Sequence, residues 1–157
     1  MRAHILGAVA SLIEQLQADA LDSAAPVTVL LRKAKATAVK LNLPEFAAWT
    51  EHELSGYSED GEVPKYRILH AHLKYWNPYR GWCPLIGSSH NVQNGQPIGE
   101  LMSLLESDSG FFTIPVAKAA RHFSQKLGFP ADVHSHISRT SLAGIIEAVR
   151  NLFSTGP

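Results

Sequence analysis

The chain has 157 residues, 45% hydrophobic and 18% charged, a composition that indicates a globular protein and excludes a disordered one. Its 14 basic and 14 acidic residues give a formal net charge of +0, which argues against nucleic-acid binding over the whole surface and leaves open only a local basic stripe. A single cysteine, Cys83, excludes an internal disulfide, and no apolar run approaches the roughly 20 residues of a membrane span, so we expect a cytoplasmic protein that does not enter a membrane.

Three helices are predicted in the first third of the chain. The first runs from about Ile5 to Leu21, and its apolar residues keep helical spacing, which favours an amphipathic helix over a signal peptide. Pro26 precedes the second helix, where a fixed φ suits a helix start. A third helix opens at Pro44 and ends at Gly56, because glycine tolerates a left-handed cap.

After an acidic turn, the hydrophobic period changes from that of a helix to that of a strand. Residues 66–76 alternate, which places His70 and His72 together on one face of a predicted strand. Residues 77–96 are rich in Gly, Pro, Ser and Asn, and we interpret them as a long loop with short extended pieces. Loops of that length inside a compact domain are often functional.

The rest of the chain is predicted to alternate between helices and strands. Strands are expected at residues 111–116 and 133–137, and helices at 97–107, at 117–127 and after a cap at Ser138 or Thr140. The predicted fold is therefore α+β: an N-terminal three-helix unit, a small, mostly antiparallel sheet and C-terminal helices.

Two blocks near the ends of the chain, residues 30–67 and 137–151, carry motifs in a distinctive order. These are Leu-Asn-Leu-Pro-Glu-Phe at 41–46, Glu-Leu-Ser-Gly-Tyr at 53–57, Pro-Lys-Tyr-Arg at 64–67 and Val-Arg-Asn at 149–151. In order and spacing they resemble the AbiTii domain family of bacterial abortive-infection, anti-phage proteins. The middle of the chain, residues 77–129, resembles the family poorly.

The resemblance implies one AbiTii-like domain over residues 1–157, either a stand-alone protein or the N-terminal part of a longer one. We expect a non-catalytic interaction domain that senses a phage-derived trigger or assembles copies of itself, with a protein partner and no cofactor. The family residues expected to be structural are Glu53, Gly56, Tyr57, Tyr66, Arg67, Arg150 and Asn151. Among them, Glu53 and Arg150 are predicted to tie the third helix to the last.

Aromatic side chains are concentrated at the end of the first predicted strand and in the segment that follows. They are Tyr75, Trp76, Tyr79 and Trp82, with Arg80 between the last two. Aromatic and arginine side chains on a loop are typical of interface anchors, whereas the alternative is a satellite core under the loop. These five residues are the predicted partner-binding surface.

Two His-x-His sequences, His70-Ala-His72 and His134-Ser-His136, support a competing hypothesis. On a strand, residues i and i+2 share a face, so each pair could chelate a metal ion, and two adjacent strands would supply four imidazoles to a metal-dependent hydrolase or nuclease. The simpler interpretation is a set of half-exposed histidines on a solvent-facing sheet. We therefore predict no catalytic residue and no metal site.

Other candidate chemistry is weaker. Cys83 is alone and is interpreted as a small hydrophobe, because a cysteine nucleophile needs an activating partner. On the second helix, Arg32, Lys33 and Lys40 could hold phosphates, but they are spread around the helix as a solvated face would be. Nucleic acid is therefore not the partner expected from the sequence.

Overall fold

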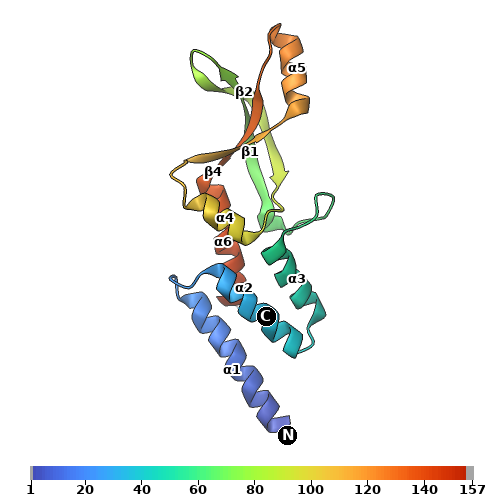
Figure 1. Cartoon of the computed structure of the whole chain (residues 1–157), viewed down its shortest axis with the longest axis vertical. Coiled ribbons are helices and arrows are strands. Elements are labelled where there is room, and N and C mark those ends of the chain that lie inside the picture. Colours follow the sequence, from blue (N-terminus) through green and yellow to red (C-terminus); the bar gives the residue numbers. More distant parts are fainter. Residues whose placement is uncertain (1, 155–157) are drawn as a thin grey trace.

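A computed structural model describes residues 2–154, with side chains from residue 7 onward. Ile5, at the predicted start of the first apolar stripe, lies outside the described side chains. The molecule is elongated, with helices at one end and a sheet at the other (Figure 1). The helical end is formed by α1 (Arg2–Leu21), α2 (Val27–Lys40) and α3 (Pro44–Ser55).

The sheet contains four antiparallel strands in the order β2-β1-β4-β3. The strands are β1 (Ile68–Asn77), β2 (Gly81–Gln93), β3 (Phe111–Pro115) and β4 (Val133–Ser138), and β1 is preceded by the 3-10 turn η1 (Lys65–Arg67). The remaining helices are α4 (Ile98–Leu105), α5 (Ala117–Leu127) and α6 (Arg139–Ser154). The α+β prediction is confirmed, and none of the described helices is long and apolar enough to cross a membrane.

One hydrophobic core joins the two ends of the molecule. Leu30 and Leu31 of α2 are fully buried in it. From the sheet, Leu69 and Ala71 point into the same core, because alternate residues of β1 share a face. Helix α6 runs from the sheet to the helical end and buries Leu142, Ile145, Val149 and Phe153 along one side.

The prediction of a loop over residues 77–96 is wrong, because most of that segment forms strand β2. The register pairs His72 with Ser89 and Lys74 with Pro84, so the four residues 85–88 bulge out opposite a single residue of β1. Gly87 and Ser88 in this bulge, Ser89 beside it, and a proline that only an edge strand tolerates give β2 the composition of a loop. The true turn is residues 78–80.

Other predicted boundaries are confirmed. Helix α5 ends at Gly128, which adopts φ +73° as a left-handed cap. Ser138 caps α6, since its Oγ accepts a hydrogen bond from the backbone N–H of Ser141 at 3.1 Å. Helix α3 starts with Pro44 in its first turn and ends at Gly56.

Replacing Gly56 with alanine is expected to lower the free energy of unfolding by about 2 kcal/mol. Gly56 has φ +94°, and an added Cβ would lie 3.0 Å from the carbonyl oxygen of Gly95, a backbone atom that cannot easily move. The matched control is Gly144→Ala in α6, where a Cβ would meet no atom within 4 Å. Because alanine is the better helix former, the control should be stabilised by roughly 0.5–1 kcal/mol. Urea unfolding of both variants measures the difference, and equal effects would contradict the prediction.

Candidate functional site

A buried polar network lies where α3, η1 and the segment after β2 meet. Glu53 and Arg67 form an ion pair, Nη2 to Oε2 at 2.6 Å, and both side chains are fully buried. The second carboxylate oxygen, Oε1, accepts hydrogen bonds from the hydroxyl groups of Tyr57 and Tyr66, each at 2.7 Å, and from Arg67 Nε at 3.1 Å. Three residues from the first predicted family block, Tyr57, Tyr66 and Arg67, therefore converge on the carboxylate of a fourth, Glu53.

The nitrogen of the Arg67 guanidinium that faces away from Glu53 is also hydrogen-bonded. Its Nη1 donates hydrogen bonds to the carbonyl oxygens of Asn94, at 3.2 Å, and Gln96, at 2.8 Å. The guanidinium carbon lies 5.1 Å from the centre of the Tyr57 ring, a cation–π distance. A buried charge is tolerated when it is paired and hydrogen-bonded in this way, so Arg67 fastens the segment after β2 to α3.

The two tyrosines of this network are held as hydrogen-bond donors. Burial, and then the hydrogen bond to Glu53, raises the pKa of both Tyr57 and Tyr66 well above the usual range. Both phenols therefore stay protonated, and Tyr66 also accepts a hydrogen bond from Trp49 Nε1 at 2.8 Å. These contacts are those of a structural element that orders the junction between the helices and the sheet.

The predicted contact between Glu53 and Arg150 is not formed. Arg150 donates instead to the carbonyl oxygens of Asp22, at 2.9 Å, and Ala25, at 2.6 Å. It therefore ties α6 to the connection between α1 and α2, while Arg67, 14 residues from Glu53, takes the place predicted for Arg150. Asn151 follows on the exposed side of α6.

The five predicted partner-binding residues lie around the tip of the β1–β2 hairpin, but they do not form one patch. Tyr79 and Arg80 occupy the turn, where the side chain of Asn77 accepts hydrogen bonds from both of their backbone N–H groups. Trp76 and Trp82 are a cross-strand pair on one face, with ring centres 5.4 Å apart. The alternation of β1 places Tyr75 on the opposite face.

The solvent exposure of these side chains differs from one to the next. Tyr79 is 96% exposed and Trp76 45% exposed, so both can meet a partner. Trp82 is half-buried, and its ring centre lies 4.7 Å from that of His134 and 4.7 Å from that of His136. Trp82 is thus part of a small aromatic cluster beside the exposed Trp76.

The two His-x-His sequences lie on adjacent strands. His72 is directly opposite His136, and Lys74 is opposite His134, so all four imidazoles belong to one face of the sheet. They do not converge, because among the described residues no three His, Cys, Asp or Glu side chains are placed to hold one metal ion. The sequence alone could not show whether the two histidine pairs lie close together, because it does not give the pairing register of β1 and β4.

His136 is instead enclosed by aromatic rings. It is 5% exposed, its ring centre lies 4.8 Å from that of Phe111, and neither ring nitrogen has a hydrogen-bond partner among the described residues. Burial, followed by the positive charge of Lys74, lowers the pKa of His136 to about 4. The sequence does not associate Phe111 or Lys74 with His136, because only the pairing of the strands brings these side chains together.

The helical end has an apolar groove of about 630 Å³ between α1, α2, α3 and α6. Its lining residues are Ile13, Leu16, Gln17, Thr37, Ala38, Leu41, Leu43, Phe46, Trp49, Leu152 and Phe153. None of these described side chains is titratable, so they offer the groove no acid or base.

Together, the fold and these sites define an α+β domain in which a buried arginine–glutamate network joins α3 to η1 and to the segment after β2 of a four-stranded sheet. The chain belongs to the AbiTii family, whose model matches residues 11–153. The match includes residues 77–129, where the sequence motifs resemble the family poorly. AbiTii is an abortive-infection family, and this membership supports a role in bacterial antiviral defence. No curated protein and no solved structure matches the chain.

Proposed function

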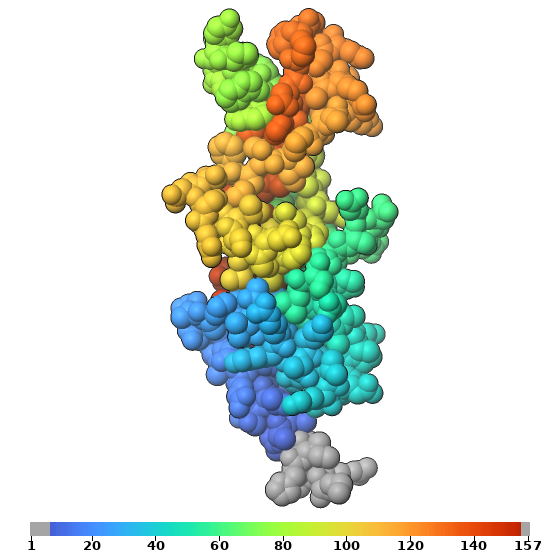
Figure 2. All heavy atoms as spheres, in the orientation of Figure 1, coloured from blue at the N-terminus to red at the C-terminus, as the bar shows by residue number. Residues whose placement is uncertain are grey.

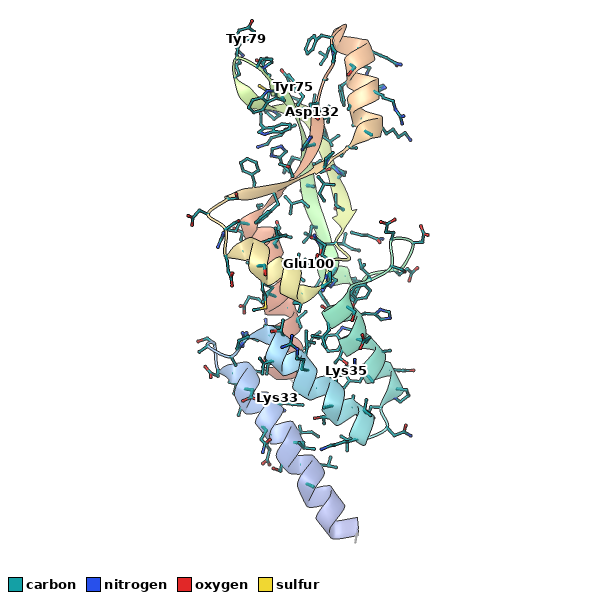
Figure 3. The ribbon with its side chains drawn as sticks, in the orientation of Figure 1. Lys33, Lys35, Tyr75, Tyr79, Glu100 and Asp132 are labelled. Atoms are coloured by element: carbon teal, nitrogen blue, oxygen red, sulfur yellow. The ribbon has the colours of Figure 1, made fainter. Side chains whose placement is uncertain are left out.

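We propose that this chain is a non-catalytic interaction domain in bacterial abortive infection and that the tip of the β1–β2 hairpin binds its partner. The partner is either a phage-derived trigger or a second copy of the chain. The observation that carries this proposal is the exposure of Tyr79 and Trp76 near the hairpin tip. Figure 3 shows Tyr79 at the end of the molecule far from α1. Large aromatic side chains left in water are the usual anchors of an interface.

The tip is built to present these side chains in a fixed position. The hydrogen bonds of Asn77 hold the turn, and Trp82 supports Trp76 from the neighbouring strand. Side chains that are already ordered lose less conformational entropy when they bind, which favours affinity. Arg80, exposed in the same turn, adds a charged group that can pair with an acidic partner.

The non-catalytic part of the proposal is supported by the environment of the histidines. A catalytic histidine needs one ring nitrogen oriented by a partner and the other directed at substrate. Among the described residues, both nitrogens of His136 are buried without a hydrogen-bond partner, and Cys83 Sγ makes a weak hydrogen bond to the carbonyl oxygen of Gly81, at 3.6 Å. His136 therefore packs against aromatic rings and is not an oriented base. His134 Nε2 lies 3.1 Å from Asp132 Oδ1, but its Nδ1 is buried without a hydrogen-bond partner in the part of the chain that the structure describes, so it is not directed at a substrate.

The double variant Trp76→Ala/Tyr79→Ala is expected to abolish protection of bacteria against phage and to weaken self-association, because it removes both exposed anchors. Loss of hot-spot aromatics costs about 2 kcal/mol or more each, roughly a thirtyfold change in affinity. Phage plaque counts and analytical ultracentrifugation measure these two outcomes. The control is Leu21→Ala, which removes a side chain 77% exposed at the other end of the molecule. A folded double variant that keeps both properties would show that the tip is not the contact surface.

A further inference from the structure

Charge is distributed unevenly along the molecule, although the total is +0. We call residues 68–96 and 109–138, which contain the four strands and α5, the sheet end. It holds five basic residues and one acidic residue, Asp132, for a net charge of +4, so the rest of the chain carries −4. Six of the eight histidines also belong to the sheet end, and none of its strands contains an Asp or Glu.

The basic residues of the sheet end are available to a ligand. At the helical end, Lys33 pairs with Asp19 at 2.5 Å, and Lys35 pairs with Glu51. In the described part of the chain, no carboxylate pairs with any of the five basic residues of the sheet end, which are Lys74, Arg80, Lys118, Arg121 and Lys126. All of them except Lys74 are exposed. Figure 2 shows the hairpin and α5 projecting side by side at the end opposite α1.

Flat aromatic rings lie on the same end. On the face of the sheet that carries the four histidines, Trp76 and Phe111 are each 45% exposed, and Lys74 Nζ lies 5.6 Å from the centre of the Phe111 ring. Further along this face, β2 presents the exposed polar side chains of Ser89, Asn91 and Gln93. Cations, stacking surfaces and neutral hydrogen-bonding groups are thus combined on a surface without strand carboxylates.

We propose that the sheet end binds single-stranded RNA. The exposed cations of α5 and the hairpin would neutralise phosphates, and Trp76 and Phe111 would stack on bases that a single strand leaves accessible. Ser89 and Asn91 can hydrogen-bond base edges and 2′-hydroxyl groups, which favours RNA over DNA. An acidic protein could use both the cations and the rings, so a poly-glutamate peptide serves as the competing ligand in the test below. This inference rests on the proposed function, since it names the chemistry of the partner at the hairpin.

The test is a fluorescence-anisotropy titration of the full chain with a labelled uridine oligonucleotide of about 20 nucleotides. Binding should weaken steeply between about 50 mM and about 200 mM salt, as phosphate contacts require. Trp76→Ala should weaken binding about tenfold, the cost of losing one stacked base. Lys118→Ala/Arg121→Ala/Lys126→Ala should reduce the slope of log affinity against log salt by about 2, because about 0.7 counterion is released per phosphate contact.

The matched control is Arg32→Ala/Lys33→Ala/Lys40→Ala, which removes three cations from α2 at the helical end and should leave RNA binding unchanged. The proposal is overturned if the uridine oligonucleotide does not bind or if both triple variants lose equal affinity. It is also overturned if duplex RNA, a poly-glutamate peptide or a thymidine oligonucleotide binds as tightly.

The two proposals fail separately. If the tip variant Trp76→Ala/Tyr79→Ala loses phage protection while the wild-type chain binds no RNA, the interaction surface stands and RNA is not its partner. If Trp76→Ala loses RNA binding while the tip variant still protects bacteria, the sheet end binds RNA but the hairpin tip does not carry the defence function.

Discussion

Replacing Arg67 with methionine should lower the free energy of unfolding by about 3–5 kcal/mol, which is the usual cost of leaving a buried charge without its partner. Methionine fills a similar volume, so the effect would come from charge and hydrogen bonds more than from a cavity. The Glu53 carboxylate would remain fully buried with only two tyrosine hydroxyl groups as donors. The carbonyl oxygens of Asn94 and Gln96 would also lose the guanidinium. Urea unfolding monitored by circular dichroism measures the loss.

Two further variants test whether the unpaired charge is the cause. Glu53→Gln/Arg67→Met keeps an oxygen to accept from Tyr57 and Tyr66 but leaves no charge buried, so it should be less destabilised than Arg67→Met alone. Lys35→Met breaks an ion pair with Glu51 that is exposed to solvent, and exposed pairs contribute about 0–1 kcal/mol. If Lys35→Met and Arg67→Met cost the same, the buried network does not hold the junction.

The helices could be predicted from the sequence because their signals are local. Apolar residues at helical spacing, Pro44 at a helix start and Gly128 at a helix end each act within a few residues, and the structure places α3 and α5 accordingly. Strand β2 could not be predicted in this way. Its pairing with β1 tolerates Pro84 and a four-residue bulge, and neither feature has a strand-like composition.

The candidate sites depended on contacts between distant parts of the chain. The sequence indicates that Glu53 is a structural residue, but it does not show that its ion-pair partner is Arg67 and not Arg150. That pairing depends on the path of η1, which brings Arg67 into contact with Glu53 of α3. The alternation of β1 placed His70 and His72 on one face, whereas only the strand order could bring His136 opposite His72. The distribution of charge could not be predicted either, because a net charge of +0 does not show which end of the folded molecule is basic.

His136 should make the stability of the protein depend on pH below neutrality. Its folded-state pKa is lowered to about 4 from 6.5, so the folded protein holds the neutral imidazole while the unfolded chain takes up a proton. Stability is therefore fully present above about pH 6.5 and is lost as the pH falls towards 4, by up to about 3 kcal/mol. Between about pH 7.5 and pH 5 the contribution of this one group is about 2 kcal/mol. Urea unfolding at both values measures it.

His136→Phe should remove this contribution, because phenylalanine fits the aromatic surroundings formed by Trp82 and Phe111 and has no group to protonate. It also removes two buried nitrogens that lack hydrogen-bond partners, so the variant should be at least as stable as the wild type at about pH 5. His70→Phe, at an exposed position on the same face, should retain the wild-type pH dependence. Because carboxylates titrate in all three proteins, only the difference between the variants isolates His136. A His136→Phe protein that loses as much stability as the wild type on acidification would mean that His136 is protonated in the folded state without penalty.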